Sequence, residues 1–491
     1  MNKILLFFAL LITLMSFGQD GSLDLSFGDG GVVIMDLNNS QDLVWNVVEQ
    51  ADNKIIVSGA MTQNNQNYYP YLVRFMTDGT LDSAFGTDGL VLSNDNGFDE
   101  FKFLFYDDSQ NIIAAGPKNQ SSTFVVAKYL DDGNLDSTFA DNGIKIIPNG
   151  NYVGMTLLSD GSFLLLKFSN NNTITINHFL NNGSLNLNFG VDGDAISSYS
   201  GESFQGVEIK TDANNNIYFL GKRNNIAGAD IILMRFNPDG YLDTSFGSNG
   251  ITTKFLAFDP MNSSTASLDF TNDNKIVIAG SCGACVDLFE PVFQPYFLRY
   301  NSDGSPDANF GSDGTVLLPV SGFSISRLII QDNQRLIVGG QYLDCFEGSI
   351  YGIVRYFAGG TQDNSFIGGG VDFNYITSFM QADGNILSVG NTFWYNGPED
   401  IVLLRHNNNP LTIDEFENQK VIVYPNPSNG IFIIERNFFS EKENYQITDI
   451  TGKIIATGQL NEKQTQLDLS SAQSGVYFLK TSNSGYRLLK N

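Results

Sequence analysis

One short segment decides the fold: Asp78-Gly79-Thr80-Leu81-Asp82-Ser83-Ala84-Phe85-Gly86-Thr87-Asp88-Gly89. It recurs at residues 20–30, 132–143, 182–193, 239–250 and 303–314, and in degenerate form at residues 359–370. The phenylalanines that anchor the copies lie 50 to 64 residues apart, and they are Phe27, Phe85, Phe139, Phe189, Phe246, Phe310 and Phe366. Self-similarity at such a period identifies a repeat architecture, here with seven units.

Each unit contains four runs of apolar residues separated by turn residues. In the first unit the runs are 32–35, 44–48, 54–59 and the run that ends at Arg74-Phe75. The third run ends on glycine in six of the seven units, at Gly59, Gly116, Gly221, Gly280, Gly340 and Gly390. Four short strands per repeat predict an all-β chain with a seven-bladed β-propeller over residues 19–406. A right-handed β-solenoid is the competing architecture, but its coils are usually about half this length.

The repeat resembles the delta-sixty repeat family of bacterial β-propellers over about residues 20–406. The resemblance rests on the block x-Asp-Gly-x-Leu-Asp-x-x-Phe-Gly-x-x-Gly and on the Ile-Ile-Val-x-Gly strand, as at residues 55–59. Two copies depart from the block, since Asn186 replaces its second aspartate and Ile367 replaces the glycine after Phe366. The resemblance implies a propeller fold and no single shared activity.

Two columns of the repeat carry charge. The basic column holds Arg74, Lys128, His178, Arg235, Arg299, Arg355 and Arg405, and the acidic column holds Asp24, Asp82, Asp136, Asn186, Asp243, Asp307 and Asp363. We favour a structural latch, in which each basic side chain holds the acid that follows it by a bidentate bond between blades. His178 is followed by Asn186, so both partners lose their charge together, as a latch requires. The alternative is a ring of cations for an anionic ligand.

The ring is expected to close through the N-terminal segment. The block at residues 23–27 has no strand before it, and Arg405 has no block after it. A closed propeller leaves no free strand edge. We therefore expect Asp24 and Phe27 to dock against Arg405 as the missing part of the last unit.

The ends of the chain indicate export. Residues 1–18 combine a basic start, a short apolar run and small residues before Gln19, which is typical of a secretory signal peptide. The apolar run is shorter than the ~20 residues of a membrane-spanning helix, so no membrane span is expected after signal removal. Residues 407–420 form a polar linker, and residues 421–491 alternate strand-like runs with turns. This last pattern predicts a small Ig-like β-sandwich.

Three ordered blocks in residues 421–491 resemble the type A C-terminal sorting domain of the type IX secretion system. The first block is Tyr424-Pro425-Asn426-Pro427-Ser428-Asn429-Gly430, and the others are residues 447–453 and 467–480, the last of which contains Gly475. The resemblance implies the type IX machinery as partner and export by a diderm bacterium through the periplasm. The protein would then be secreted or held at the outer cell surface. An unrelated Ig-like adhesion module is the alternative.

Composition and motifs exclude several functions. The chain has 27 Lys and Arg against 53 Asp and Glu, a net charge of −26, which argues against nucleic-acid binding. His178 and His406 are the only histidines, and no nucleophile elbow, phosphate loop or dinucleotide fingerprint occurs. We therefore expect no catalytic, cofactor-binding or metal residues, with calcium at the Asp-Gly turns as the alternative. The cysteines leave two pairings open, Cys282–Cys285 and Cys285–Cys345.

Aromatic residues concentrate in the loops after the third run of units five, six, seven and one, which neighbour one another in a closed ring. The candidate ligand-binding residues are Trp394, Tyr395, Tyr68, Tyr69, Phe289 and Tyr342. Aromatic side chains suit stacking on sugar rings or anchoring a protein, although they could instead cap the outer strands. The expected function is a secreted or cell-surface scaffold that binds a glycan or protein. A secreted carbohydrate-active hydrolase or lyase that uses two carboxylates is the alternative.

Overall fold

The computed structural model describes residues 20–62, 68–93, 99–118, 123–148, 152–169, 173–198, 204–225, 228–256, 266–284, 292–318, 322–344, 348–366, 368, 373–393, 398–408, 421–436, 443–449, 452–460, 464–481 and 485–491. The chain divides into two compact units, Met1–Asn409 and Pro410–Asn491. The described residues form strands and no helix, so the chain is all-β. Among them no helix long and apolar enough to cross a membrane occurs. The predicted signal peptide and linker residues 409–420 lie outside the described residues.

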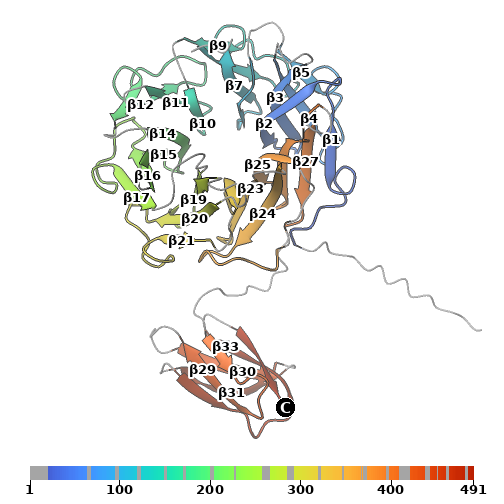
Figure 1. The fold of residues 1–491 in the computed structure, drawn as a ribbon, viewed down its shortest axis with the longest axis vertical. Coiled ribbons are helices and arrows are strands. Elements are labelled where there is room, and N and C mark those ends of the chain that lie inside the picture. Colours follow the sequence, from blue (N-terminus) through green and yellow to red (C-terminus); the bar gives the residue numbers. More distant parts are fainter. Residues whose placement is uncertain are drawn as a thin grey trace, which may run out of the picture. The chain divides into compact units, whose positions relative to one another are not determined.

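The first unit is a β-propeller whose described residues form seven antiparallel sheets around a central axis (Figure 1). We call these sheets blades 1 to 7. From the inside outward, blade 1 contains β2 (Gln41–Glu49), β3 (Ile55–Thr62), β4 (Tyr69–Phe75) and β5 (Leu90–Leu92); blade 2 contains β6 (Phe103–Tyr106), β7 (Ile112–Lys118), β8 (Thr123–Tyr129) and β9 (Ile144–Ile147); and blade 3 contains β10 (Tyr152–Leu157), β11 (Phe163–Ser169), β12 (Thr173–Phe179) and β13 (Asp194–Ser198). Blade 4 contains β14 (Phe204–Thr211), β15 (Ile217–Asn225), β16 (Gly228–Phe236) and β17 (Ile251–Leu256), and blade 5 contains β18 (Ala266–Phe270), β19 (Ile276–Ala284), β20 (Val292–Tyr300) and β21 (Thr315–Leu317). Blade 6 contains β22 (Phe323–Ile330), β23 (Leu336–Asp344) and β24 (Gly348–Tyr356), and blade 7 contains β25 (Asn374–Met380), β26 (Ile386–Asn391), β27 (Ile401–His406) and β1 (Val32–Met35).

The N-terminal strand completes the last blade. β1 pairs antiparallel with β27, with Val32 opposite Leu404 and Met35 opposite Ile401. The backbone N–H of Asp24 also donates to the carbonyl of Arg405 at 2.8 Å. In Figure 1 the blue β1 therefore lies beside the orange β27. The outer edge of β27 is covered, as a closed ring requires.

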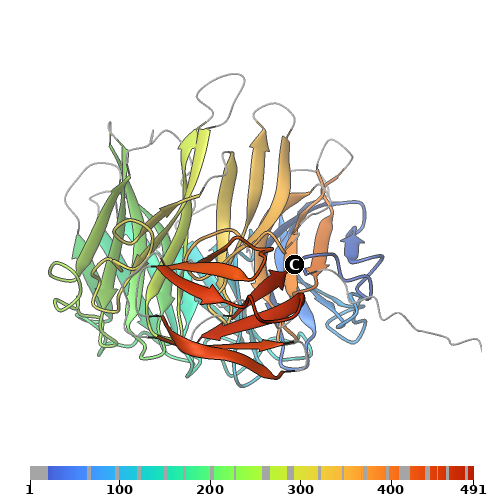
Figure 2. The same ribbon diagram turned by 90° about the horizontal axis from the view of Figure 1, so that it is seen from below.

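The blades pack face to face, and their strands run along the ring axis when the unit is seen from the side (Figure 2). Each of seven apolar clusters joins residues of neighbouring blades. The cluster that joins blades 7 and 1, for example, includes Phe27, Val57, Val73 and Leu403, which are all fully buried. The anchoring phenylalanine of each repeat lies in one of these clusters, which explains its periodic recurrence.

The third apolar run of the repeat forms the second strand of a blade. The glycines that end this run let the strand approach the innermost strand closely. A Cβ atom on Gly59 would lie 1.9 Å from the carbonyl oxygen of Leu43, and one on Gly340 would lie 2.0 Å from that of Ser324. The innermost strand bulges at this level in five blades, where one extra residue interrupts the pairing register. The extra residues are Trp45, Val153, Val207, Ser326 and Ile376. A bulge of this kind re-aims a side chain and is often found beside functional sites.

The second unit is a small two-sheet sandwich. One sheet has the order β28 (Val421–Tyr424), β29 (Ile431–Arg436) and β32 (Gln464–Asp468), and the other has the order β31 (Ile454–Leu460), β30 (Glu443–Asp449), β33 (Gly475–Thr481) and β34 (Gly485–Lys490). Both sheets contribute to one core that includes Phe432, Ile447 and Leu479. The sequence pattern did not predict β34, which pairs with β33 along its length.

Candidate functional site

Basic and acidic columns of the repeat meet at the turns between the third and fourth strands of the blades. Arg74 Nε donates to Asp82 Oδ2 at 2.8 Å, and its guanidinium carbon lies 4.5 Å from the centre of the Phe85 ring. Arg235, Arg299, Arg355 and Arg405 repeat both contacts, with Asp243 and Phe246, Asp307 and Phe310, Asp363 and Phe366, and Asp24 and Phe27 respectively. The cation–π contact with the anchoring phenylalanine was not predicted from the sequence. The sequence does hold a signal for it, because the arginine and the phenylalanine lie 11 residues apart, as Arg74 and Phe85 do, in each of these repeats except that of Arg405.

The sequence-based latch needs one correction, because the Arg–Asp pair lies within a blade rather than between blades. Arg299 and Asp307 flank the turn that joins β20 to β21 of one sheet. The contact to the next blade is made by Nη1, which donates to the carbonyl of Ala358 at 2.8 Å. Likewise Arg405 Nη1 donates to the carbonyl of Thr77 in blade 1 at 2.7 Å. The guanidinium thus joins an acid of its own blade to the backbone of its neighbour.

Two blades replace the arginine, with different results. His178 Nδ1 lies 3.0 Å from Asn186 Nδ2, so a neutral hydrogen bond stands where the other blades have an ion pair. Lys128 lies 3.5 Å from Asp107 and donates to Asn181 of the next blade. The ammonium group of Lys128 therefore contacts Asp107 rather than Asp136. Asp136 Oδ1 instead accepts hydrogen bonds from the backbone N–H and the hydroxyl of Thr138.

The N-terminal residues extend these contacts to blade 6. Arg355 is fully buried and lies 2.7 Å from Asp363 and 2.5 Å from Asp20. Burial raises the pKa of Asp363, but hydrogen bonds from Ser365 and the charge of Arg355 outweigh it and hold the pKa below its usual value. Asp363 is therefore ionised in the folded protein, and its charge is compensated by Arg355.

Three of the predicted aromatic residues, Tyr68, Tyr69 and Tyr342, lie on the opposite face, which we call the loop face. It carries the hairpins that join the second and third strands of each blade, and the connection from β1 to β2. Tyr68 and Tyr342 are half-exposed there, and Tyr69 packs partly against the core of blades 7 and 1. The Tyr342 ring also contacts Phe323 at 4.7 Å between centroids. Trp394, Tyr395, Phe289, Cys285 and Cys345, and the side chain of Cys282, lie outside the described residues.

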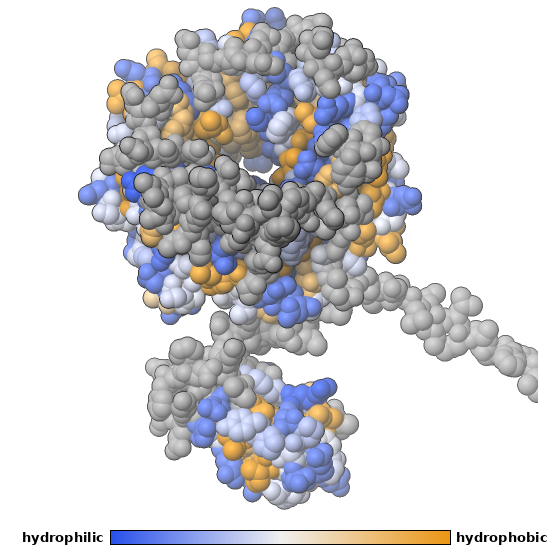
Figure 3. All heavy atoms as spheres, in the orientation of Figure 1, coloured by the Kyte–Doolittle hydropathy of each residue, from blue (hydrophilic) through white to orange (hydrophobic). Residues whose placement is uncertain are grey.

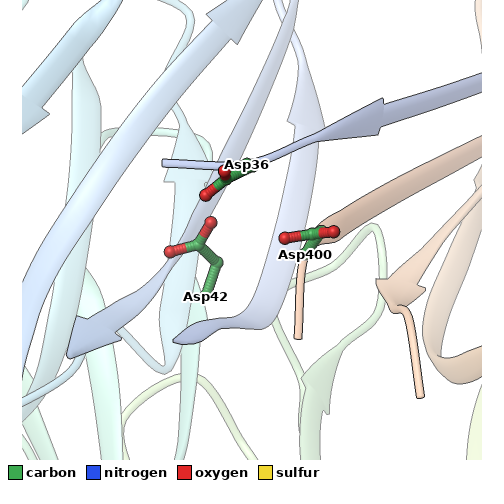
Figure 4. Close-up of side chains that lie close together, drawn as sticks. All are labelled: Asp36, Asp42 and Asp400. Carbon is green, nitrogen blue, oxygen red and sulfur yellow. The ribbon is translucent and has the colours of Figure 1, made fainter. Parts of the chain in front are cut away.

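Three carboxylates gather on the loop face between blades 7 and 1 (Figure 4). Asp36 follows β1, Asp42 lies in β2 and Asp400 precedes β27, and one oxygen of each lies within 4.8 Å of the others. Asp42 is fully buried and accepts from the backbone N–H of Leu37 at 2.6 Å and from the hydroxyl of Ser40. Burial, together with the charges of Asp36 and Asp400, raises the pKa of Asp42 to about 7. These oxygens are the hard ligands that a divalent cation such as Ca²⁺ prefers.

The raised pKa of Asp42 makes stability depend on pH. The folded protein retains a proton on Asp42 up to about pH 7, whereas the usual pKa of the group is 3.8, so stability is lost as pH rises between these values. Asp42→Asn should remove this loss, because an amide is neutral at every pH and its oxygen can still accept from the backbone N–H of Leu37. Thermal unfolding of the mature protein from pH 4.5 to 8 should show a smaller decline for D42N than for the wild type. The exposed Asp239→Asn is the matched control, and an equal decline in D42N and the wild type would contradict the assignment.

The turn aspartates that suggested calcium hydrogen-bond within their own turns. Asp78 Oδ1 accepts from the backbone N–H and the hydroxyl of Thr80 at 2.9 and 2.7 Å. Asp303 and Ser305 form the same pair of bonds. These carboxylates therefore fix the turn conformation.

A central channel is the third candidate region. Its cavity of about 470 Å³ is lined by the innermost strands of six blades and includes Trp45, Phe103, Glu208, Lys210 and Arg327. In the ring view, apolar residues border the hollow near the axis (Figure 3). Glu208 is the one carboxylate among the described residues that line it, and it lies 3.6 Å from Arg327, while Lys210 of the lining lies 2.5 Å from Asp269. This arrangement differs from the pair of close carboxylates that a glycoside hydrolase needs.

In the second unit, the predicted sorting motif lies against the C-terminal strand. The side chain of Asn426 donates to the carbonyl of Arg487 at 2.7 Å and accepts from the N–H of Leu489 at 2.8 Å. Pro425 and Pro427 flank this asparagine, and Gly430 has a positive φ of 121° in the turn before β29. A Cβ there would lie 2.7 Å from the Cα of Ser470, which explains the glycine. Tyr424 is half-exposed, and Gly475 begins β33.

Comparisons with known proteins agree with this division into two units. Residues 50–85, 213–246, 271–310 and 381–409 match the model of a β-propeller domain of unknown function, DUF5122. A search of curated proteins finds no match.

Solved structures similar to the chain share little sequence with it. A catalytically inactive virginiamycin B lyase from Staphylococcus aureus is 12% identical with a TM-score of 0.44, over 76% of this chain and 98% of that chain. A protein of unknown function from Dyadobacter fermentans is 11% identical with a TM-score of 0.41, over 77% and 98%. PorZ, a surface component of the type IX secretion system of Porphyromonas gingivalis, is 11% identical with a TM-score of 0.28, over 94% and 70%.

The C-terminal unit gives the clearest match. Residues 422–491 match the model of the secretion system C-terminal sorting domain. The matched segment covers both sheets of the sandwich and the Pro-Asn-Pro block that contacts β34. The protein is thus a β-propeller with a type IX secretion sorting domain, which directs it to the cell surface or the extracellular space of a diderm bacterium.

Proposed function

We propose that the protein is an exported binding scaffold of the delta-sixty repeat type, which uses the loop face of its propeller to bind a glycan or a protein at the cell surface. The observation that carries this proposal is that the loop face presents half-exposed Tyr68 and, at the junction of blades 7 and 1, the carboxylates of Asp36, which is exposed, and Asp400, which is partly exposed. Aromatic rings stack on sugar faces, and carboxylates accept hydrogen bonds from sugar hydroxyls or from protein donors.

The alternative of a carbohydrate-active enzyme receives less support. Catalysis by two carboxylates needs an acid and a base about 5–10 Å apart on either side of a bound sugar. Among the described residues that line the channel, Glu208 is the one carboxylate, and it pairs with Arg327 instead. Asp42 has the raised pKa of a general acid, but its side chain is fully buried and hydrogen-bonded to Ser40 and Leu37. Binding therefore fits the described geometry better than hydrolysis.

Screening the mature protein on glycan and polypeptide arrays tests the proposal. The double variant Trp394→Ala with Tyr395→Ala, and separately Tyr68→Ala, should weaken binding of the selected ligand by about tenfold, since aromatic anchors dominate such interfaces. The melting temperature should stay nearly unchanged, because Tyr68 is half-exposed.

Tyr241→Ala is the matched control, since Tyr241 is exposed on the turn at the opposite face. A large fall in melting temperature in the tested variants would show that these rings are packing residues. Turnover of an array glycan would favour the enzyme instead.

A further inference from the structure

The central channel has two chemically different walls. The innermost strands of blades 7, 1, 2 and 3 present an apolar and aromatic wall that includes Ile376, Phe379, Trp45, Phe103 and Met155. Blades 4 and 6 present Glu208, Lys210 and Arg327. A cavity with an aromatic platform opposite charged groups fits a ligand that has both an apolar face and a charged substituent.

Glu208 and Lys210 reach across the inner edge of blade 5. Glu208 Oε2 accepts from the backbone N–H of Leu268 at 2.7 Å, and Lys210 Nζ lies 2.5 Å from Asp269 Oδ1. Both partners belong to β18 of blade 5. Lys210 is therefore held by a close acid, and Glu208 is held by a backbone donor.

Arg327 is the least satisfied cation of the charged wall. Its ion pair with Glu208 is long, at 3.6 Å, and its Nε has no hydrogen-bond partner among the described residues. The side chain is 36% exposed although it lines a cavity. A guanidinium that remains accessible in a narrow cavity is suited to a planar carboxylate, which it can bind in a bidentate manner.

Trp45 supplies the platform on the other wall. It is the extra residue of the bulge in β2, which places it at the channel, and Lys102 Nζ lies 4.9 Å from the centre of its ring. The side chain of Lys102 is 46% exposed. The channel therefore combines an indole with the accessible guanidinium of Arg327, in a chain whose net charge is −26.

We propose that the channel binds a uronic-acid-containing saccharide, with Trp45 against the sugar face and Arg327 on its carboxylate. The cavity volume of about 470 Å³ lies in the ~300–1,000 Å³ range of small-ligand sites, which suits a short saccharide rather than a polymer. Asn46 and Thr377 line the same cavity and offer an amide and a hydroxyl group to sugar hydroxyls. This site is distinct from the loop face, so the two proposals can fail separately.

Isothermal titration of the mature protein with digalacturonate, and with a neutral disaccharide as comparison, tests the proposal. Digalacturonate should bind, the neutral disaccharide should bind at least about tenfold more weakly, and affinity should fall with added salt because the contact is ionic. Arg327→Gln should weaken digalacturonate binding by about tenfold or more. Glu208→Gln should strengthen it, because an amide still accepts from Leu268 while the guanidinium loses its competing carboxylate.

Lys254→Gln is the matched control, since Lys254 lies on the outer strand β17 and pairs there with Asp313. Its affinity should equal that of the wild type, and the loop variant W394A with Y395A should also leave it unchanged. Absence of digalacturonate binding by the wild type, equal affinity for the neutral disaccharide, or unchanged affinity in R327Q would each overturn the proposal. Preferential binding of an acidic peptide would do so too.

Discussion

Replacing Arg355 by methionine should lower the free energy of unfolding of the propeller by about 3–5 kcal/mol, the usual effect of removing one member of a buried ion pair. Arg355 is fully buried, and its removal leaves Asp363, which is 2% exposed, and Asp20 without their shared partner. Arg335, 3.2 Å from Asp363, compensates only part of this charge. The contact with Asn408 at the end of blade 7 is lost as well.

Denaturant unfolding of the mature protein, followed by tryptophan fluorescence, measures this effect. Adding Asp363→Asn to R355M should recover part of the loss, because it removes the uncompensated charge. Lys254→Met removes a partly exposed ion pair with Asp313 and should change stability by no more than about 1 kcal/mol. Equal stability of R355M and K254M would show that Arg355 does not join blade 6 to the N-terminal segment.

The periodic part of the structure could be predicted from the sequence because it repeats. The recurring block places Phe85 and its equivalents in the cores between blades, and it places Asp82 at a fixed distance from Arg74. The closure of the ring by β1 was also predictable, since the block around Asp24 lacked the strand that Arg405 provides. These features depend on local sequence, and every repeat offers another observation of them.

The candidate sites could not be predicted in the same way, because they depend on residues that break the repeat. The acidic cluster brings Asp400 beside Asp36 and Asp42, from opposite ends of the propeller sequence. The channel joins Trp45 of blade 1 to Arg327 of blade 6 through bulges that a single sequence does not reveal. The strand-ending glycines were visible, but the clash that a Cβ on Gly59 would make with the carbonyl of Leu43 is a three-dimensional fact.

Deleting residues 415–491 should abolish delivery to the cell surface and leave the propeller in the periplasm, because the sorting domain of residues 422–491 directs the last export step. The propeller should still fold, since the two units have separate cores and the described strands of the first unit end at His406. Fractionation of the producing bacterium, with protease treatment of whole cells, distinguishes the two locations. A milder variant, Asn426→Ala, removes both hydrogen bonds between the Pro-Asn-Pro block and β34, and it should reduce surface delivery without the large truncation. The matched control is Asn444→Ala, which removes one exposed hydrogen bond, to Gln459 of the neighbouring strand, and should be exported normally. Surface delivery of the truncated protein at the normal level would refute the role assigned to the C-terminal unit.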